Sequence, residues 1–175
     1  QEEINVVWDL LPHDLSILNF LFPQKKVKSV YACAISPLQT NNEQLANVII
    51  KYNDGFHSHI NLSWISPVKM RLILIGGDKK MALFDDVEPS EKIKLYDKGI
   101  EIKKTEITSF KPIYRTGEII IPTWDNKEAL QRAVDLFSDV ITQETKENIT
   151  LKMAINFLKV LEACDLSIKF GKEIK

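Results

Sequence analysis

The N-terminal segment carries hydrophobic side chains at a helical period. They recur at steps of four, four, three and four residues, at Val7, Leu11, Leu15, Leu18 and Phe22. This spacing predicts an α-helix with one apolar face. Proline costs about 3 kcal/mol inside a helix but is tolerated in the first turn. Because Pro12 falls within the pattern, we expect the helix to begin near Leu11 or to kink there, and to end before Pro23.

Beyond this segment the pattern changes to short β-rich runs separated by turn residues. The predicted strands are residues 27–35, 45–52, 56–65, 70–75, 80–84, 92–96, 100–104 and 119–121. The sequence Asn53-Asp54-Gly55 is typical of a hairpin turn between the second and third strands. No connection between these strands is long enough to hold a crossover helix, so we expect antiparallel pairing.

The third predicted strand alternates between two faces. One face carries Phe56, Ser58, Ile60, Leu62 and Trp64, and the other carries His57, His59, Asn61, Ser63 and Ile65. Such alternation is typical of a sheet with one core face and one face of different character.

Two amphipathic helices are predicted at the end of the chain. Asp125 followed by Glu128 resembles a capping box at the start of the first helix, and the second is expected from about Thr150 to Ile168. The apolar stripes expected to enter the core are Leu130, Ala133, Val134, Phe137, Val140 and Ile141, then Ala154, Phe157, Leu158, Leu161, Cys164 and Ile168. This order of elements predicts a single α+β domain over residues 1–175, an open-faced, mainly antiparallel β-sheet with helices packed on one face.

Composition narrows the possible functions. The 175 residues include 23 Lys and Arg against 24 Asp and Glu, and a net charge of −1 creates no field that would collect nucleic acid. The longest uncharged apolar run, Leu15–Phe22, is far shorter than the ~20 residues that span a bilayer. Cys33 and Cys164 have apolar neighbours, which predicts reduced core thiols in a cytoplasmic protein. The six glycines form neither G-x-G-x-x-G nor G-x-x-x-x-G-K-[ST], so no phosphate-binding loop is expected.

The best candidate for chemistry lies on the N-terminal helix. Asp9, His13, Ser16 and Phe20 follow one another at steps of four, three and four, on the face opposite the apolar stripe. A histidine oriented by a neighbouring aspartate is suited to acid–base catalysis near neutral pH. The alternative is an ordinary solvated face, with Asp9 or Asp14 capping the helix.

Two further pairs of residues have the side chains to bind an anion or a metal ion. Lys69 and Arg71 are two residues apart on one predicted strand face, which suits an anionic ligand such as a phosphate or carboxylate, although surface charge on an edge strand has the same pattern. His57 and His59 also share a strand face, but no third ligand follows nearby, so we expect no metal site.

Four motifs together carry a resemblance to a known family. They are D-x-x-x-H at residues 9–13, S-W-x-x-P-x-K-x-R at 63–71, G-x-x-x-M-x-x-x-D-D at 77–86 and L-E-A-x-x-x-S at 161–167. In this order they resemble the C-terminal half of the glucose-fructose oxidoreductase, inositol dehydrogenase and rhizopine catabolism (Gfo/Idh/MocA) family. The family's D-x-G-x-H-x-x-D pattern matches at Asp9 and His13, whereas Leu11 replaces its glycine and Ser16 its last aspartate.

The resemblance implies a C-terminal substrate-binding and oligomerisation domain whose N-terminal Rossmann domain is absent from this chain. It implies that His13 takes or returns the hydroxyl proton of a sugar-like alcohol while NAD or NADP, bound by the parent protein and not by this fragment, carries the hydride. Asp9 would assist, and Lys69 and Arg71 suggest a nucleotide sugar or sugar acid as substrate. The alternative is a stand-alone binding or oligomerisation module without catalysis.

The same resemblance, and the mixed polarity of the uncovered sheet face, predict self-association. We expect a homodimer or homotetramer formed through that face, with Ile65 among the buried residues.

Overall fold

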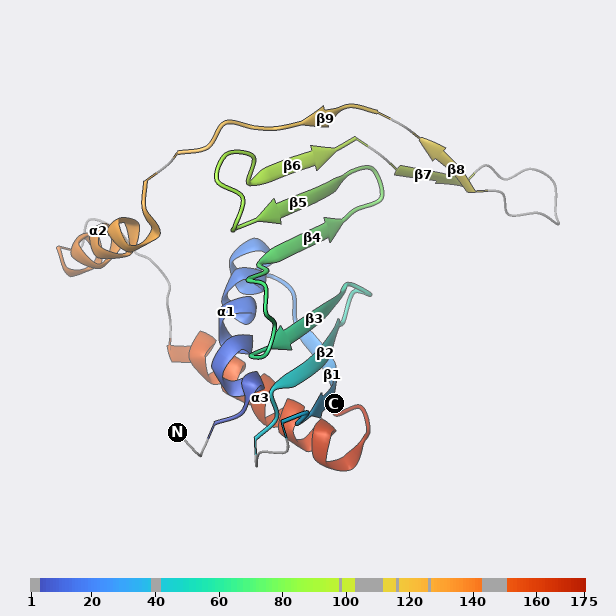
Figure 1. The fold of residues 1–175 in the computed structure, drawn as a ribbon, viewed down its shortest axis with the longest axis vertical. Helices are drawn as coiled ribbons and strands as arrows, with labels where there is room; N and C mark the ends of the chain where they lie inside the picture. The colour runs from blue at the N-terminus through green and yellow to red at the C-terminus, as the bar shows by residue number, and fades with distance from the viewer. Residues whose placement is uncertain are drawn as a thin grey trace. The chain divides into compact units, whose positions relative to one another are not determined.

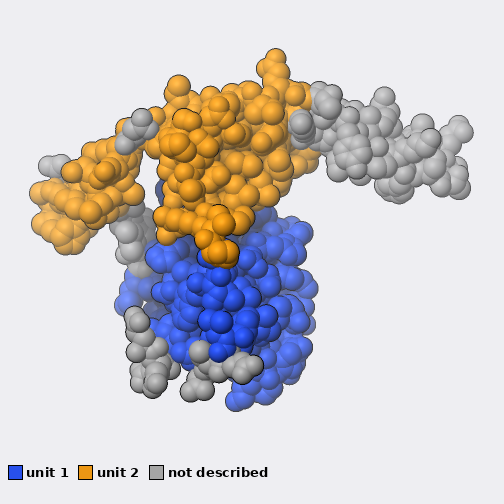
Figure 2. Space-filling view, viewed as in Figure 1, with its two compact units in different colours: residues 1–66, 146–175 blue, residues 67–145 orange. Residues whose placement is uncertain are grey.

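The structure, a computed structural model, describes residues 4–38, 42–97, 99–102, 112–115, 117–125, 127–142 and 151–175. Within these ranges it has three helices and nine strands, and all the strand pairs are antiparallel (Figure 1). The predicted α+β class is therefore confirmed. The chain divides into two compact units, Gln1–Ser66 with Lys146–Lys175 (unit 1) and Pro67–Thr145 (unit 2), which Figure 2 colours separately. Among the described helices, none is long and apolar enough to cross a membrane.

The N-terminal helix α1 (Val6–Leu21) begins earlier than predicted. The Asn5 side chain accepts hydrogen bonds from two backbone N–H groups of the first turn, each at 3.1 Å, and so caps the helix. Pro12 then lies inside a continuous helix, and the predicted start near Leu11 is wrong. The buried residues of α1 are Val6, Val7, Leu11 and Leu15.

Unit 1 holds a three-stranded antiparallel sheet made of β1 (Val27–Ile35), β2 (Leu45–Tyr52) and β3 (His57–Ser63), in that order. The predicted hairpin turn joins β2 to β3, and Gly55 adopts a φ of 87°, which glycine reaches without strain. Helices α1 and α3 (Leu151–Phe170) pack against this sheet (Figure 1). Alternate residues of these strands form one core face, as predicted for residues 56–65.

Helix α3 is buried only in its C-terminal half. The residues buried there are Val160, Leu161, Cys164 and Ser167, whereas Ala154 and Leu158 of the predicted stripe are exposed. Ser167 joins α3 to β1 because its Oγ accepts a hydrogen bond from the Ala32 N–H at 2.9 Å and donates to the Lys172 carbonyl at 2.7 Å. The chain end completes this edge of the sheet through an antiparallel bridge between Val30 and Ile174.

The other face of the unit 1 sheet is exposed in the described residues. It carries Tyr31, Cys33, Ile35, Asn47, Lys51, His57, His59 and Asn61. Cys33 is therefore exposed, and its prediction as a core residue is wrong, whereas Cys164 is buried as expected. Side chains on a strand alternate between faces, so the apolar neighbours of Cys33 lie on the opposite face from it.

Unit 2 contains a second antiparallel sheet in the order β4-β5-β6-β9. Its strands are β4 (Leu72–Gly76), β5 (Met81–Asp85), β6 (Ile93–Tyr96) and β9 (Ile119–Ile120). A two-stranded ribbon of β7 (Gly99–Ile102) and β8 (Pro112–Arg115) is also present, and β8 was not predicted from the sequence. Residues 103–104 of the predicted strand lie outside the described residues.

Helix α2 (Ala129–Ile141) has the predicted amphipathic pattern but no buried residue. Phe137, in the middle of the expected core stripe, is 68% exposed. The predicted capping box is wrong: Glu128 is the N-cap without a side-chain bond, and Asp125 accepts instead from the Lys127 N–H and the Arg132 guanidinium. The stripe predicts the helix correctly, but it does not identify the surface that would cover it.

Two strand boundaries differ from the prediction near the second motif. Strand β3 ends at Ser63, so Trp64 and Ile65 lie beyond it, and β4 begins at Leu72, so Lys69 and Arg71 precede it. Pro67 lies between these strands and supplies no backbone donor for sheet pairing. The connection is therefore irregular and directs its side chains independently of the sheet alternation.

Candidate active site

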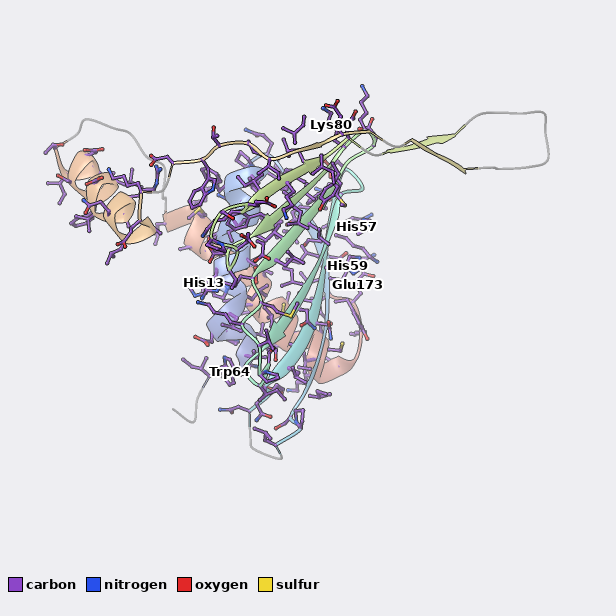
Figure 3. All side chains as sticks on the ribbon, turned by 45° about the horizontal axis from the view of Figure 1, so that its top comes forward. His13, His57, His59, Trp64, Lys80 and Glu173 are labelled. Atoms are coloured by element: carbon purple, nitrogen blue, oxygen red, sulfur yellow. The ribbon has the colours of Figure 1, made fainter. Side chains whose placement is uncertain are left out.

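The candidate pair Asp9 and His13 lies on the exposed face of α1. Four residues apart in a continuous helix, the two side chains occupy neighbouring positions one turn apart. Both are exposed, and Figure 3 shows His13 projecting from α1 on the side away from the sheet. The helix thus presents an imidazole beside a carboxylate at a surface that a substrate can reach.

Trp64 brings a third side chain to this surface. Its indole Nε1–H donates to the Asp9 Oδ2 at 2.8 Å, and 41% of Trp64 remains exposed. Trp64 belongs to the S-W-x-x-P-x-K-x-R motif, and the alternation of the predicted strand places it on the face of Phe56, Ile60 and Leu62. The strand ends one residue earlier, and the indole turns to α1 instead.

Backbone hydrogen bonds fix both partners of this contact to the same short segment. The Val6 N–H donates to the Glu43 carbonyl and the Trp64 N–H donates to the Gln44 carbonyl, each at 3.0 Å. Gln44 is itself buried just before β2. The first turn of α1 and the Trp64 backbone are therefore held by two consecutive residues.

Two neighbours on α1 have roles in the helix itself. The Ser16 hydroxyl donates to the His13 backbone carbonyl at 2.7 Å, so this hydrogen bond is made to the helix backbone and not to the imidazole. Asp14 is half-buried, and this burial raises the pKa of its carboxyl above the usual value, while the nearby His13 lowers it by a smaller amount.

Lys69 and Arg71 belong to unit 2 and lie in the irregular segment before β4. The Arg71 guanidinium is 3.4 Å from the Asp86 carboxylate, which Lys92 also contacts at 3.2 Å. The hydrogen bond from Lys92, and secondly that from Arg71, lower the pKa of Asp86. Arg71 therefore already shares a carboxylate, whereas Lys69 is exposed and has no ion-pair partner among the described residues.

The two histidines of β3 lie on the open sheet face, away from α1 (Figure 3). Their ring centroids are 5.3 Å apart, and they line a surface hollow together with Lys28 and Lys51. Within the part of the chain that the structure describes, no group of three potential metal ligands occurs.

The described glycines do not form a dinucleotide cradle. Gly55 and Gly171, the two with positive φ, lie in a hairpin turn and directly after α3, and Gly77 lies in the turn between β4 and β5. A nicotinamide dinucleotide needs a glycine-rich turn at a helix N-terminus for its pyrophosphate. The glycines in the described part of the chain do not lie in such a turn.

Comparison with known proteins agrees with the motifs. Residues 3–82 match the GFO/IDH/MocA C-terminal domain family. No curated protein sequence matches the chain. Among solved structures, UDP-N-acetylglucosamine 3-dehydrogenase GnnA from Acidithiobacillus ferrooxidans has a TM-score of 0.75 at 15% identity, covering 96% of this chain and 48% of that protein.

Two other solved structures are similar over nearly the whole chain. A putative NADPH-dependent oxidoreductase from Desulfitobacterium hafniense has a TM-score of 0.71 at 17% identity, covering 97% of this chain and 47% of its own. An aldose-aldose oxidoreductase from Caulobacter crescentus, complexed with glycerol, has a TM-score of 0.69 at 14% identity, with the same two coverages of 97% and 47%. The chain therefore spans about half the length of each of these proteins. The resemblance to the Gfo/Idh/MocA family is confirmed: residues 3–82 match the family's C-terminal domain, and the solved structures share the fold of nearly the whole chain.

Proposed function

We propose that this chain is the C-terminal substrate-binding and oligomerisation domain of an NAD(P)-dependent oxidoreductase. Its substrate is a secondary alcohol of a sugar, sugar acid or nucleotide sugar. The observation that carries the proposal is the exposed Asp9–His13 pair on α1, in a chain that matches this family's C-terminal domain. The similar folds of a nucleotide-sugar dehydrogenase and an aldose-aldose oxidoreductase support the substrate class.

In this proposal His13 acts as the acid–base residue. Oxidation of the alcohol breaks its O–H and C–H bonds and forms a carbonyl. His13 would take the proton at a ring nitrogen, and a nicotinamide held by the parent protein would supply the hydride acceptor. His13 is suited to this step because imidazole exchanges protons near neutral pH. Asp9, at the neighbouring position on the helix, orients the imidazole and stabilises its protonated form.

The cofactor, NAD or NADP, is held by a parent protein and not by this chain, whose glycines match neither phosphate-binding pattern. The fragment alone is therefore expected to be inactive. The parent reading frame distinguishes this enzyme from a stand-alone binding module: a glycine-rich loop encoded upstream of residue 1 would support the enzyme. With two free cysteines and no disulfide between them, we propose a cytoplasmic location.

Lys69 and Arg71 are proposed to bind an anionic part of the substrate. A phosphate or carboxylate would compete with Asp86 for the Arg71 guanidinium, and Lys69 offers a second cation two residues away. This arrangement favours a nucleotide sugar or a sugar acid over a neutral sugar.

We also propose that the open face of the unit 1 sheet packs against a second copy of the chain. Tyr31 and Ile35 are 37% and 60% exposed there, beside polar Asn47 and Asn61. A face of this mixed character is suited to a symmetric dimer or tetramer interface. Ile65 is not part of it, because β3 ends before that residue.

The test of the catalytic proposal is His13→Ala in the full-length parent. We expect kcat to fall by roughly 10² to 10⁴, the usual contribution of a general acid–base. The melting temperature should stay the same, because the His13 side chain is exposed. Ser16→Ala is the matched control, since Ser16 lies on the same helix face and contacts only backbone. A His13→Ala enzyme with the kcat of the wild type would leave this helix face without a catalytic role.

A further inference from the structure

We propose that Trp64 is a positioning residue that fixes the Asp9 carboxylate for the reaction. This inference rests on the proposed function, because it gives Trp64 a role through the Asp9–His13 pair. The indole is a donor only, and its single N–H is used on the Asp9 Oδ2 at 2.8 Å. Among the described residues no second donor to Asp9 is recorded, so its Oδ1 is left for His13 or a substrate hydroxyl.

Without such a bond, Asp9 would have considerable rotamer freedom. It is exposed on a helix surface, where a carboxylate moves between staggered rotamers. A hydrogen bond to an ionised acceptor is shorter and about twice as strong as a neutral one, so the indole selects one orientation. Because reacting groups must be aligned closely, a loss of this alignment costs rate.

The indole can act in this way because the backbone that carries it is bonded to the segment that also holds the start of α1. The backbone bonds from Trp64 to Gln44 and from Val6 to Glu43 hold the two sides of the contact on consecutive residues. The Asp9 N–H also donates to the Asn5 carbonyl, within the first turn of α1. The donor and the carboxylate therefore share one rigid support.

A second indole–carboxylate pair in unit 1 provides a comparison. Trp8 Nε1–H donates to the Asp165 Oδ2 at 2.7 Å and joins α1 to α3. This bond has the same chemistry as that of Trp64, but its acceptor is Asp165 on α3 and not Asp9. Substituting each tryptophan in turn therefore distinguishes the loss of any indole donor from the loss of the donor to Asp9.

The experiment is a double-mutant cycle in the full-length parent. Trp64→Phe keeps the ring but removes the N–H, and we expect kcat/KM to fall about three- to thirty-fold. In an Asp9→Ala background the same substitution should change kcat/KM by less than about twofold, because the group it positions is gone. Trp8→Phe should leave kcat/KM within about twofold of wild type. An equal loss in both backgrounds, or no loss in the wild-type background, would overturn the positioning role.

The contact itself is tested on this chain by NMR of the three indole N–H groups. Asp9→Ala should shift the Trp64 indole signal and leave those of Trp8 and Trp124 in place, since these donate to Asp165 and to the Ser90 carbonyl. An unmoved Trp64 signal would overturn the proposal. If His13→Ala lowers kcat but Trp64→Phe does not, only the positioning role fails. A parent without dehydrogenase activity overturns both proposals, while the indole signals still report the contact.

Discussion

At the scale of single residues, two carboxylates on α1 differ in their surroundings. Asp9 is exposed and hydrogen-bonded, whereas Asp14 is half-buried and its pKa is raised, chiefly by burial. Its ionised form is therefore less stable in the folded protein than in the unfolded chain. The folded protein therefore loses stability as the pH rises from the ordinary pKa of this carboxyl to its raised value.

We expect Asp14→Asn to raise the melting temperature at neutral pH. The amide removes the cost of a buried charge, and the gain should disappear below about pH 3, where the carboxyl is protonated in both states. Thermal unfolding at the two pH values measures this. Asp54→Asn is the opposite control: a hydrogen bond from Lys25 lowers the pKa of Asp54, so no gain is expected. An equal gain at both pH values would point to a cause other than ionisation.

The candidate site was only partly predictable from sequence. Asp9 and His13 were found because a helix brings positions four apart together, which is a local rule. Trp64 was not, because its contact with Asp9 joins residues 55 apart in sequence and depends on where β3 ends. The S-W pair just after a strand was a visible signal, but the alternation pattern assigned that tryptophan to the core.

At the scale of elements, alternation and periodicity predicted the strands and helices better than their ends. The start of α1 depends on the Asn5 cap, a single side-chain contact that the apolar stripe does not contain. Helix α2 was predicted from its apolar stripe, yet that stripe is exposed. The pattern specifies which face of the helix is apolar but not which surface covers that face.

The joint between α3 and β1 gives a prediction at this scale. Ser167→Ala should lower the free energy of unfolding by about 1–3 kcal/mol, because the buried Ala32 N–H loses its acceptor. Urea denaturation measures the loss. Ser138→Ala, at an exposed position of α2, should change stability by less than about 0.5 kcal/mol. Equal stabilities of the Ser167 variant and wild type would mean that another group satisfies the Ala32 N–H.

At the scale of the whole molecule, the reactivity of one of the two cysteines can measure whether the open sheet face is covered. Cys33 is exposed on that face, between Tyr31 and Ile35. Cys164 is buried, and this burial raises the pKa of its thiol to about 12, so it supplies almost no reactive thiolate. A thiol reagent applied to the native chain should therefore modify Cys33 alone.

If a second copy covers the sheet face, the rate of Cys33 modification should fall as the protein concentration rises from about 1 to about 100 μM. Light scattering over the same range should show the mass of a dimer or tetramer. Ile35→Glu places a charge on the face, so we expect a monomer whose Cys33 reacts quickly at every concentration. Val87→Glu, at an exposed apolar position of unit 2, is the control that should associate like wild type. A monomeric wild-type chain, or a Cys33 rate independent of concentration in an associated one, would exclude this face as the interface.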